Sequence, residues 1–183
     1  MDFLTLAANR HSCRSFTEEP VSCADIARCA EAARLAPSAR NTQPWRIVIV
    51  DEQPLLGKVQ EQTSDEELHL NLFTKGAPVL AAFVNEGIPY EPMDRGKMKG
   101  DNYTKSDIGG AILSFCLQAE ELGLGTCIIG SFCADGVKKL LGIPAEKGLD
   151  LMVALGHPAP GEVKKLRRPA EDVLFYNGYP ADK

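Results

Sequence analysis

The sequence predicts a mixed α+β fold in a single domain that spans residues 1–183. Helical and strand-like segments alternate irregularly along the chain, which favours α+β architecture over a regular series of βαβ units. A length of 183 residues lies near the usual upper size of one compact domain. Hydrophobic residues at 44% and charged residues at 25% match a globular average, so the chain is expected to bury a sizeable core without disulfides.

The first half of the chain contains two predicted helices, each associated with a predicted strand. Ser22 and Asp25 form a capping box, and apolar residues then recur at helical spacing until Pro37 ends the run. A second capping pattern predicts a helix over residues 64–73. Short apolar runs predict strands at residues 46–50 and 78–84.

The second half begins with a polar connection over residues 85–105, of the length that often forms a lid or a binding loop. A long amphipathic helix is expected from Asp107 until Gly123 ends it. The remaining expected elements are a strand at 125–129, a short helix at 137–141 and a strand at 149–155. From Gly161 onward the tail is basic and then aromatic.

Composition and charge exclude several classes of protein. A net charge of -5 argues against general nucleic-acid binding, so any anionic ligand must be held by a local basic cluster. The longest apolar run, residues 77–84, is far shorter than the ~20 residues of a membrane helix. The N-terminus lacks the basic start, apolar run and cleavage site of a secretory signal, which predicts a cytoplasmic protein.

The six cysteines predict neither a disulfide framework nor a metal site. They lack CxxC spacing, and the three histidines are scattered without an HExxH motif. We expect reduced, mostly buried thiols and no bound metal, with a redox or zinc role as the alternative.

Familiar nucleotide and hydrolase motifs are missing from the sequence. Gly123, Gly125 and Gly130 follow a predicted helix and open a strand, whereas the glycines of a dinucleotide fingerprint follow a strand and open a helix. No GxxxxGK[ST] or GxSxG pattern occurs. Rossmann dehydrogenase and serine hydrolase chemistry therefore lose support.

Two basic segments offer the groups that grip a phosphate. In an extended chain, Arg10, Ser12 and Arg14 project from the same face, and two guanidiniums with a hydroxyl suit a phosphate dianion. Lys165 and Arg167 would share a face in the same way. Taken alone, the two arginines of the first segment could equally pair with surface acids, and the second segment could be solvated surface.

A turn-rich loop over residues 36–46 is dense in small hydrogen-bonding side chains. Asn41 and Gln43 present amide donors and acceptors that would complement the edge of a heterocyclic ring, and two prolines stiffen the loop. An ordinary connection from helix to strand is the alternative, and Trp45 is expected in the core.

Five sets of motifs, in order across nearly the whole chain, resemble the FMN-dependent nitroreductase family. The most specific is the APSxxNxQPW segment at residues 36–45. The others are Arg10-His11-Ser12 with Arg14 and Phe16, Asp107 leading to LGLGT and GSF at 122–132, LGHP at 155–158, and KxRxP at 165–169. The resemblance implies a central, mainly antiparallel sheet flanked by helices. It also implies an intertwined homodimer, in which residues 161–183 reach the partner, with one FMN in each of two interface sites.

The same resemblance gives a set of expected cofactor contacts. The FMN phosphate and ribityl chain would be held by Arg10, Ser12, Arg14, Lys165 and Arg167, with His11 near the ring. The other subunit would edge the flavin with Pro37, Ser38, Ala39 and Asn41. The ring contacts from the same subunit would be Ile129, Gly130 and Ser131, with Asn71 at the pyrimidine edge. Arg40 stands where the family commonly has a small residue, and Ser131 stands where many members have glycine.

The implied activity is that of an oxidoreductase in which NAD(P)H donates a hydride to flavin N5. The reduced flavin would pass electrons to a small acceptor such as a nitroaromatic or a quinone, in a ping-pong mechanism, and no catalytic acid or base is expected because the flavin carries the chemistry. Two alternatives stay open. One is a non-catalytic flavin-binding or redox-sensing protein in which Cys127 reports the flavin state, and the other is a dehydrogenating or dehalogenating branch of the family.

Overall fold

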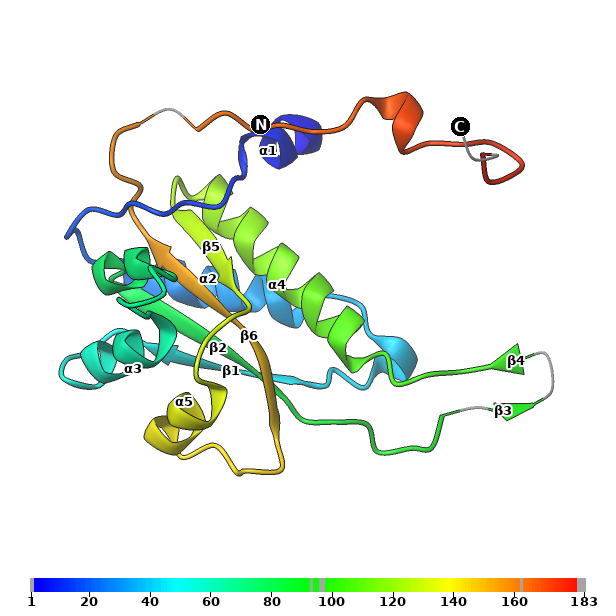
Figure 1. Ribbon diagram of the computed structural model, residues 1–183. Coiled ribbons are helices and arrows are strands. Elements are labelled where there is room, and N and C mark those ends of the chain that lie inside the picture. The colour runs from blue at the N-terminus through cyan, green and yellow to red at the C-terminus, as the bar shows by residue number, and fades with distance from the viewer. Residues whose placement is uncertain (1, 93, 96–97, 162, 181–183) are drawn as a thin grey trace.

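A four-stranded antiparallel sheet with helices on both faces forms the centre of the computed structural model, which describes residues 2–92, 94–95, 98–161 and 163–180 (Figure 1). The strand order is β1-β2-β6-β5. The strands are β1 (Trp45–Val50), β2 (Val79–Asn85), β5 (Gly125–Ile129) and β6 (Gly148–Gly156), with a separate hairpin of β3 (Asp94–Arg95) and β4 (Met98–Lys99). The helices are α1 (Phe3–Asn9), α2 (Cys23–Arg34), α3 (Leu55–Thr63), α4 (Thr104–Glu121) and α5 (Ala134–Leu141), with 3-10 turns η1 (Ala39–Asn41), η2 (Leu72–Gly76) and η3 (Ala170–Asp172). The α+β prediction is confirmed.

The two central strands are buried on both faces, which explains their nearly continuous apolar sequences. In β2, alternate side chains enter different clusters: Phe83 joins the core under α2 and α4, whereas Leu80 joins the core under α3 and α5. The Phe83 ring meets Phe115 of α4 edge to face, with centroids 5.8 Å apart. The sheet is therefore a full middle layer, and a ligand has to bind at its edges.

The prediction of a helix over residues 64–73 is wrong. The helix in this region is α3, which lies earlier in the chain and has Ser64 as its C-cap. The buried side of α3 combines two apolar residues with Gln60 and Thr63, so the apolar periodicity there is weak. After α3 the chain turns, since an Asp65 carboxylate oxygen accepts from the Leu68 N–H at 2.8 Å. Asn71 then adopts a left-handed conformation, which no helix continues through.

Other boundaries differ from the sequence prediction by a turn or less. Helix α4 begins at Thr104 instead of Asp107, and α5 begins at Ala134 instead of 137. The polar connection 85–105 contains the β3–β4 hairpin, and the short α1 was not expected at all. Helix α1 rests beside α4 and buries none of its own residues, although its sequence is mostly apolar and leaves Phe3 and Leu4 exposed.

An extended segment that follows α1 lies along the edge strand β5. Ser12 bridges Thr126 in parallel fashion, and the Cys13 N–H donates to the Thr126 carbonyl at 2.9 Å. The approach depends on two paired glycines, because a Cβ on Gly125 would lie 2.7 Å from the Cys13 sulfur, and a Cβ on Gly156 would lie 2.6 Å from a Pro78 ring carbon.

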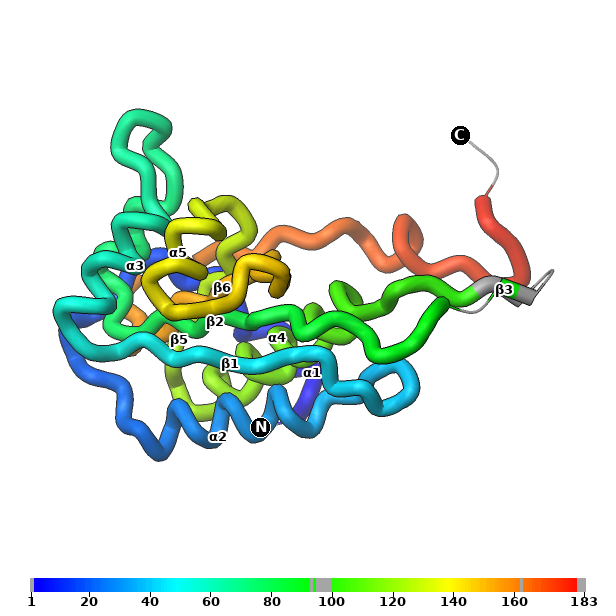
Figure 2. The backbone as a smooth tube through the Cα atoms, turned by 90° about the horizontal axis from the view of Figure 1, so that it is seen from below, coloured from blue at the N-terminus to red at the C-terminus, as the bar shows by residue number. Residues whose placement is uncertain are grey.

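The last described segment, residues 163–180, forms an arm that leaves the body of the molecule. The arm and the β3–β4 hairpin extend in the same direction beyond the sheet (Figure 2). Apolar side chains exposed on this arm are Val163, Leu166, Val173, Leu174, Phe175, Tyr176 and Tyr179. Within the described ranges, no helix is long and apolar enough to cross a membrane.

Replacing Gly156 by alanine should test the close packing at the sheet edge. We expect Gly156→Ala to lower the free energy of unfolding by about 1–3 kcal/mol, because the added methyl meets the Pro78 ring and the Phe16 side chain at 2.6–2.9 Å. The matched control is Gly76→Ala, whose Cβ would meet nothing within 4 Å. Urea unfolding measures both, and equal midpoints would contradict the packing argument.

Candidate functional site

The residues expected to grip a phosphate converge where α1 ends and the extended segment begins. Arg10 is the C-cap of α1, and its N–H donates to the Leu6 carbonyl at 3.0 Å. The bridge from Ser12 to β5 then keeps the following residues extended. Arg14 lies two residues further along, with its guanidinium carbon 5.9 Å from the centre of the Phe73 ring.

A pocket of about 220 Å³ joins this segment to the start of the C-terminal arm. Its lining consists of Arg10, His11, Ser12, Arg14, Val163, Lys164, Lys165, Leu166 and Arg167. Five of these residues carry a positive charge and none carries a carboxylate. A larger pocket of about 560 Å³ shares His11, Ser12 and Arg14 with it and extends to Pro158–Gly161. The two basic segments of the sequence therefore meet at one place.

The guanidinium of Arg10 is the decisive feature of the small pocket. Its Nε and Nη2 atoms are buried and have no oxygen or nitrogen partner among the residues that the structure describes, and the side chain lies against the buried Cys116 thiol. A buried cationic donor without a partner is costly, and an anion in the pocket would supply the missing acceptors. The donor set therefore fits a phosphate group.

The two basic residues of the arm behave differently from each other. The Lys165 ammonium donates to the carbonyls of Ala7, Ala8 and Arg10, so it is directed to the end of α1. Burial and the charges of Arg167 and Arg10 lower the pKa of Lys165. Arg167 is exposed and donates one bond, 2.7 Å long, to the Leu166 carbonyl, which leaves most of its donors available.

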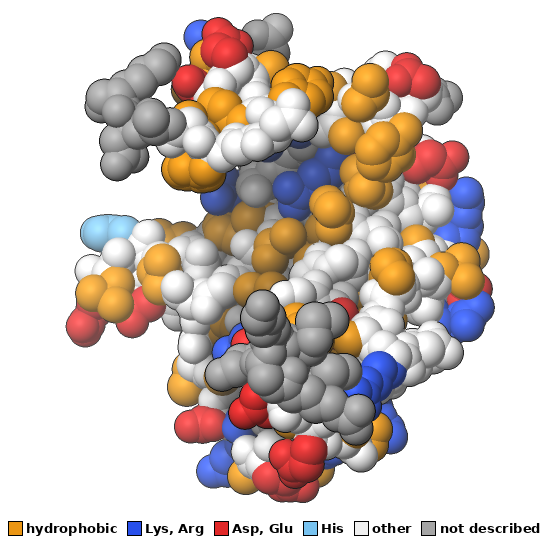
Figure 3. All heavy atoms as spheres, turned by 90° about the vertical axis from the view of Figure 1, so that its right-hand side faces the viewer, with side chains coloured by type: hydrophobic (Ala, Val, Ile, Leu, Met, Phe, Trp, Pro, Cys, Tyr) orange, Lys and Arg blue, Asp and Glu red, His pale blue; other side chains and the backbone are white. Residues whose placement is uncertain are grey.

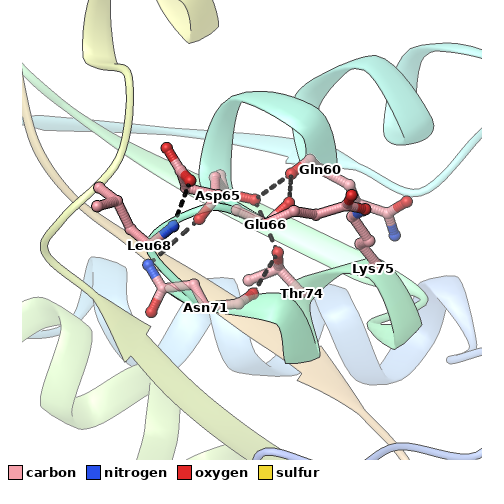
Figure 4. A network of polar contacts seen from close by, with 9 residues as sticks. Gln60, Asp65, Glu66, Leu68, Asn71, Thr74 and Lys75 are labelled. Carbon is pink, nitrogen blue, oxygen red and sulfur yellow. Dashed lines mark hydrogen bonds and ion pairs between the residues drawn. The ribbon is translucent and has the colours of Figure 1, made fainter.

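The expected ring contacts lie at and beyond the end of β5. Ile129 is buried, and Gly130 and Ser131 follow it directly. The Asn71 amide donates to the Ser131 carbonyl at 2.7 Å and to the Thr63 carbonyl at 3.2 Å, so the structure brings Asn71 to this loop. Figure 4 shows the polar network around Asn71, in which the Thr74 hydroxyl donates to the Asn71 carbonyl at 2.9 Å. This network fixes the Asn71 backbone in its left-handed conformation.

A further pocket of about 330 Å³ lies beside this loop. Its lining consists of Glu61, Gln62, Thr63, Ser64, Asp65, Leu70, Ser131, Phe132 and Cys133. Because Ser131 belongs to the lining, the pocket borders the expected ring position on the side of α3.

The expected contacts at Pro37, Ser38, Ala39 and Asn41 lie far from the basic pocket of the same chain. Register places Trp45, at the start of β1, level with Asn85, and places Thr126 level with Val79. Six residues of β2 separate these levels, about 20 Å, and β1 and β5 are opposite edge strands, about 14 Å apart. The structure thus separates the 37–41 loop from the basic pocket of the same chain.

Several contacts hold the 37–41 loop in shape. The Ala39 N–H donates to an Asp107 carboxylate oxygen at 3.1 Å, and the Ser38 hydroxyl accepts from the Gln43 N–H at 2.9 Å. Arg40, Asn41 and Gln43 all have positive φ angles, of 53°, 55° and 46°. Such a strained conformation is typical of functional loops.

A model described as the nitroreductase family matches residues 7–157. The chain belongs to the nitroreductase family. Among its relatives, FMN reductase [NAD(P)H] of Bacillus subtilis is 30% identical over 93% of this chain and 72% of that protein. Iodotyrosine deiodinase of Thermotoga neapolitana is 26% identical over 95% of this chain and 97% of that protein.

Solved structures give the same fold. An oxidoreductase described as containing FMN superimposes with a TM-score of 0.81 at 25% identity, over 100% of this chain and 94% of that chain. A nitroreductase family protein from Clostridium difficile 630 also gives 0.81, at 22% identity, over 98% of this chain and 100% of that chain. The family expected from the motifs is confirmed.

Sequence reasoning missed two residues that shape the site of this nitroreductase-family chain. Tyr90 stacks under Arg40, with the guanidinium carbon 4.2 Å from the ring centre, and so ties the 85–105 connection to the 37–41 loop. Phe73 lies under Arg14. The sequence offered only the aromatic residues themselves as a signal, and an aromatic residue in the sequence does not indicate which arginine it will contact.

The thiols are mostly buried and unreactive. Cys13, Cys29, Cys116 and Cys127 are buried, whereas Cys23 and Cys133 are exposed. Burial raises the pKa of each buried thiol, and for Cys29 it does so to about 12. Within the described part of the chain, no three His, Cys, Asp or Glu side chains gather as a metal site would require.

Thiol labelling with a disulfide reagent at pH 8 should therefore modify two cysteines, Cys23 and Cys133, in the folded protein and the other four only after unfolding. Rapid labelling of Cys127 in the native state would contradict this burial.

The pKa of Cys29 also predicts an alkaline loss of stability. The contribution of its neutral thiol is complete below about pH 9 and falls as the pH rises toward 12, because the unfolded thiol ionises first.

Proposed function

We propose that the chain is an FMN-dependent NAD(P)H oxidoreductase that reduces a small acceptor such as a nitroaromatic or a quinone. The Arg10 guanidinium carries the proposal, because its buried Nε and Nη2 atoms lie beside a pocket whose charged residues are all cationic, and an anion such as the terminal phosphate of FMN would satisfy them. The family match gives the same cofactor class, since relatives are named FMN reductase [NAD(P)H] and oxidoreductase containing FMN.

In this proposal Arg10, Ser12, Arg14 and Arg167 hold the phosphate, with His11 beside them. Ile129, Gly130 and Ser131 border the flavin ring, and Asn71 reaches its pyrimidine edge while holding the Ser131 carbonyl. When bound, FMN supplies the hydride chemistry between NAD(P)H and the acceptor. The protein residues bind and orient the cofactor and exclude water from one of its sides, so none is assigned as a catalytic acid or base.

The second half of the site comes from a partner subunit in this proposal. Pro37, Ser38, Ala39 and Asn41 lie at the opposite corner of the sheet from the basic pocket, so one flavin cannot contact both within one chain. A twofold dimer would bring this loop of each subunit to the pocket of the other. The bonds from Asp107 and Ser38 hold the loop in a fixed shape for that contact.

The C-terminal arm supports the same dimer. It exposes seven apolar side chains, three of them aromatic, and apolar surface of this extent is typical of an interface. Figure 3 shows a hollow on the face toward which the arm and the hairpin extend, with Lys and Arg side chains at its base and hydrophobic side chains around it. We propose that residues 161–183 reach across to the partner.

The buried state of Cys127 disfavours the redox-sensing alternative. A sensor thiol needs exposure and a low pKa, whereas burial raises the pKa of Cys127. The dehalogenating alternative keeps its support from relatives named iodotyrosine deiodinase. The two enzymatic readings share the cofactor site and differ in the acceptor.

Replacing Arg10 by methionine should raise the dissociation constant for FMN by roughly 10- to 150-fold, because charge-assisted hydrogen bonds contribute about 1.5–3 kcal/mol. Riboflavin, which lacks the phosphate, should bind the variant and the wild type equally. Arg34→Met is the matched control, since Arg34 pairs with Glu31 on the exposed side of α2. Fluorescence titration measures all three proteins. Unchanged FMN affinity in Arg10→Met would refute the phosphate role.

A chain ended after Arg168 should lose dimerisation and bound FMN together, because the aromatic part of the arm is removed while the basic part remains. Sedimentation and the flavin absorbance of the purified protein measure the two losses. A shortened chain that stays dimeric and keeps its full FMN content would mean that the arm packs on its own subunit.

Turnover should show parallel lines in double-reciprocal plots of NAD(P)H oxidation at several menadione concentrations, because donor and acceptor would use the same space in turn. Cys127→Ser should keep the rate within about twofold, which the redox-sensing alternative does not expect. Flavin-containing protein without steady-state turnover would overturn the enzymatic proposal. Iodide release from 3-iodo-L-tyrosine, with no menadione turnover, would move the chain to the dehalogenating branch.

A further inference from the structure

The C-terminal end of α1 is closed by two side chains from outside the helix. The last carbonyls of a helix have no partners within it. Here the Asn9 carbonyl accepts from His11 Nδ1 at 3.1 Å, and the carbonyls of Ala7, Ala8 and Arg10 all accept from Lys165 Nζ. An ammonium has three N–H donors, so this cap occupies every donor of Lys165.

Lys165 is also the point where the arm is anchored to its own subunit. Within residues 163–179, all of which the structure describes, every residue except Lys165 is exposed. The lysine joins the arm to a helix more than 150 positions earlier in the chain. A cation at a helix C-terminus is also favoured by the partial negative charge of the free carbonyls.

The cap fixes the backbone of the residue whose guanidinium lacks partners. The Arg10 N–H is bound to the Leu6 carbonyl and the Arg10 carbonyl to Lys165 at 2.7 Å, so both backbone groups of Arg10 are held. Its Nε and Nη2 atoms are buried without an oxygen or nitrogen partner, and Arg10 belongs to the lining of the pocket. Lys165 therefore holds the backbone from which the Arg10 side chain projects.

We propose that Lys165 is a positioning residue, which caps α1 and aims Arg10 at the phosphate, and is not itself a phosphate contact. The inference rests on the proposed FMN site and replaces the direct contact expected for Lys165 from the sequence. Arg10, Arg14 and Arg167 supply the cations at the phosphate. Lys165 holds the backbone of Arg10 and so orients the Arg10 side chain.

Hydrogen exchange of the full-length protein before FMN is added tests the cap. Lys165→Met should speed exchange at the Leu6 and Arg10 amides at least fivefold. Arg168→Met removes the same charge from an exposed position and should leave both amides unchanged. Unchanged exchange in Lys165→Met would overturn the cap.

A double-mutant cycle tests whether Lys165 acts through Arg10. Lys165→Met alone should raise the dissociation constant for FMN about tenfold, but less than twofold in the Arg10→Met background. Independent, multiplicative losses in the cycle would show a direct phosphate contact and overturn the proposal. Lys165→Arg provides a second test, because a guanidinium keeps the charge but has no single nitrogen with three N–H groups to serve three convergent carbonyls. Full FMN affinity in Lys165→Arg together with fast exchange at Arg10 would also overturn it.

The failure of this inference is distinguishable from failure of the proposed function. Absence of FMN binding by the wild type would refute the proposed function, and the exchange experiment would still report on the cap. FMN binding by the wild type with an additive cycle would refute only the positioning role.

Discussion

The short contact between Ser12 and Thr126 governs the arrangement of the whole site. It lays the chain after α1 against the exposed edge of β5, and it is possible only because Gly125 and Gly156 leave no side chain in the way. Through this contact the arginines on either side of Ser12 are held next to the strand that leads to Ser131. The groups proposed to bind the phosphate, and those of the same chain proposed to border the ring, thus lie along one edge of the sheet.

Within one chain, the two pockets beside that edge lie outside the packed cores of the fold. Strands β2 and β6 are covered on both faces by helices, and their side chains fill both cores. The site is therefore made from segments that add to the sheet without belonging to its core: the extended stretch after α1, the loop after β5 and the arm. The central sheet positions these segments. Because the segments lie outside the packed core, their side chains can be charged.

The sequence predicted the parts of this arrangement whose signals are local. Strand β2 is a continuous apolar run up to Asn85, and β6 is apolar apart from Asp150. The Ser22–Asp25 capping box marks the start of α2, where the Ser22 hydroxyl accepts from the Asp25 N–H. Helix α3 was missed because half of its buried side is polar. Neither the insertion of β6 between β2 and β5 nor the bond from Lys165 to α1 has a local signal, because each joins residues far apart in the chain. The family motifs supplied candidate site residues, but they carry no sign that the Lys165 ammonium donates to the end of a helix.

The distribution of charge links the ligand to the folding of both chain ends. The protein carries a net charge of -5, yet five cations from its two terminal segments surround one small pocket without a carboxylate. Mutual repulsion among them opposes the docking of the arm onto α1. The pKa of Lys165 is lowered mainly by burial and further by the charges of Arg167 and Arg10. A bound dianion would remove this cost and stabilise the docked state by mass action. Cofactor binding, the order of α1 and the direction of the arm would then be a single equilibrium, so that a dimer held together by the arm would form most readily when its flavin sites are filled.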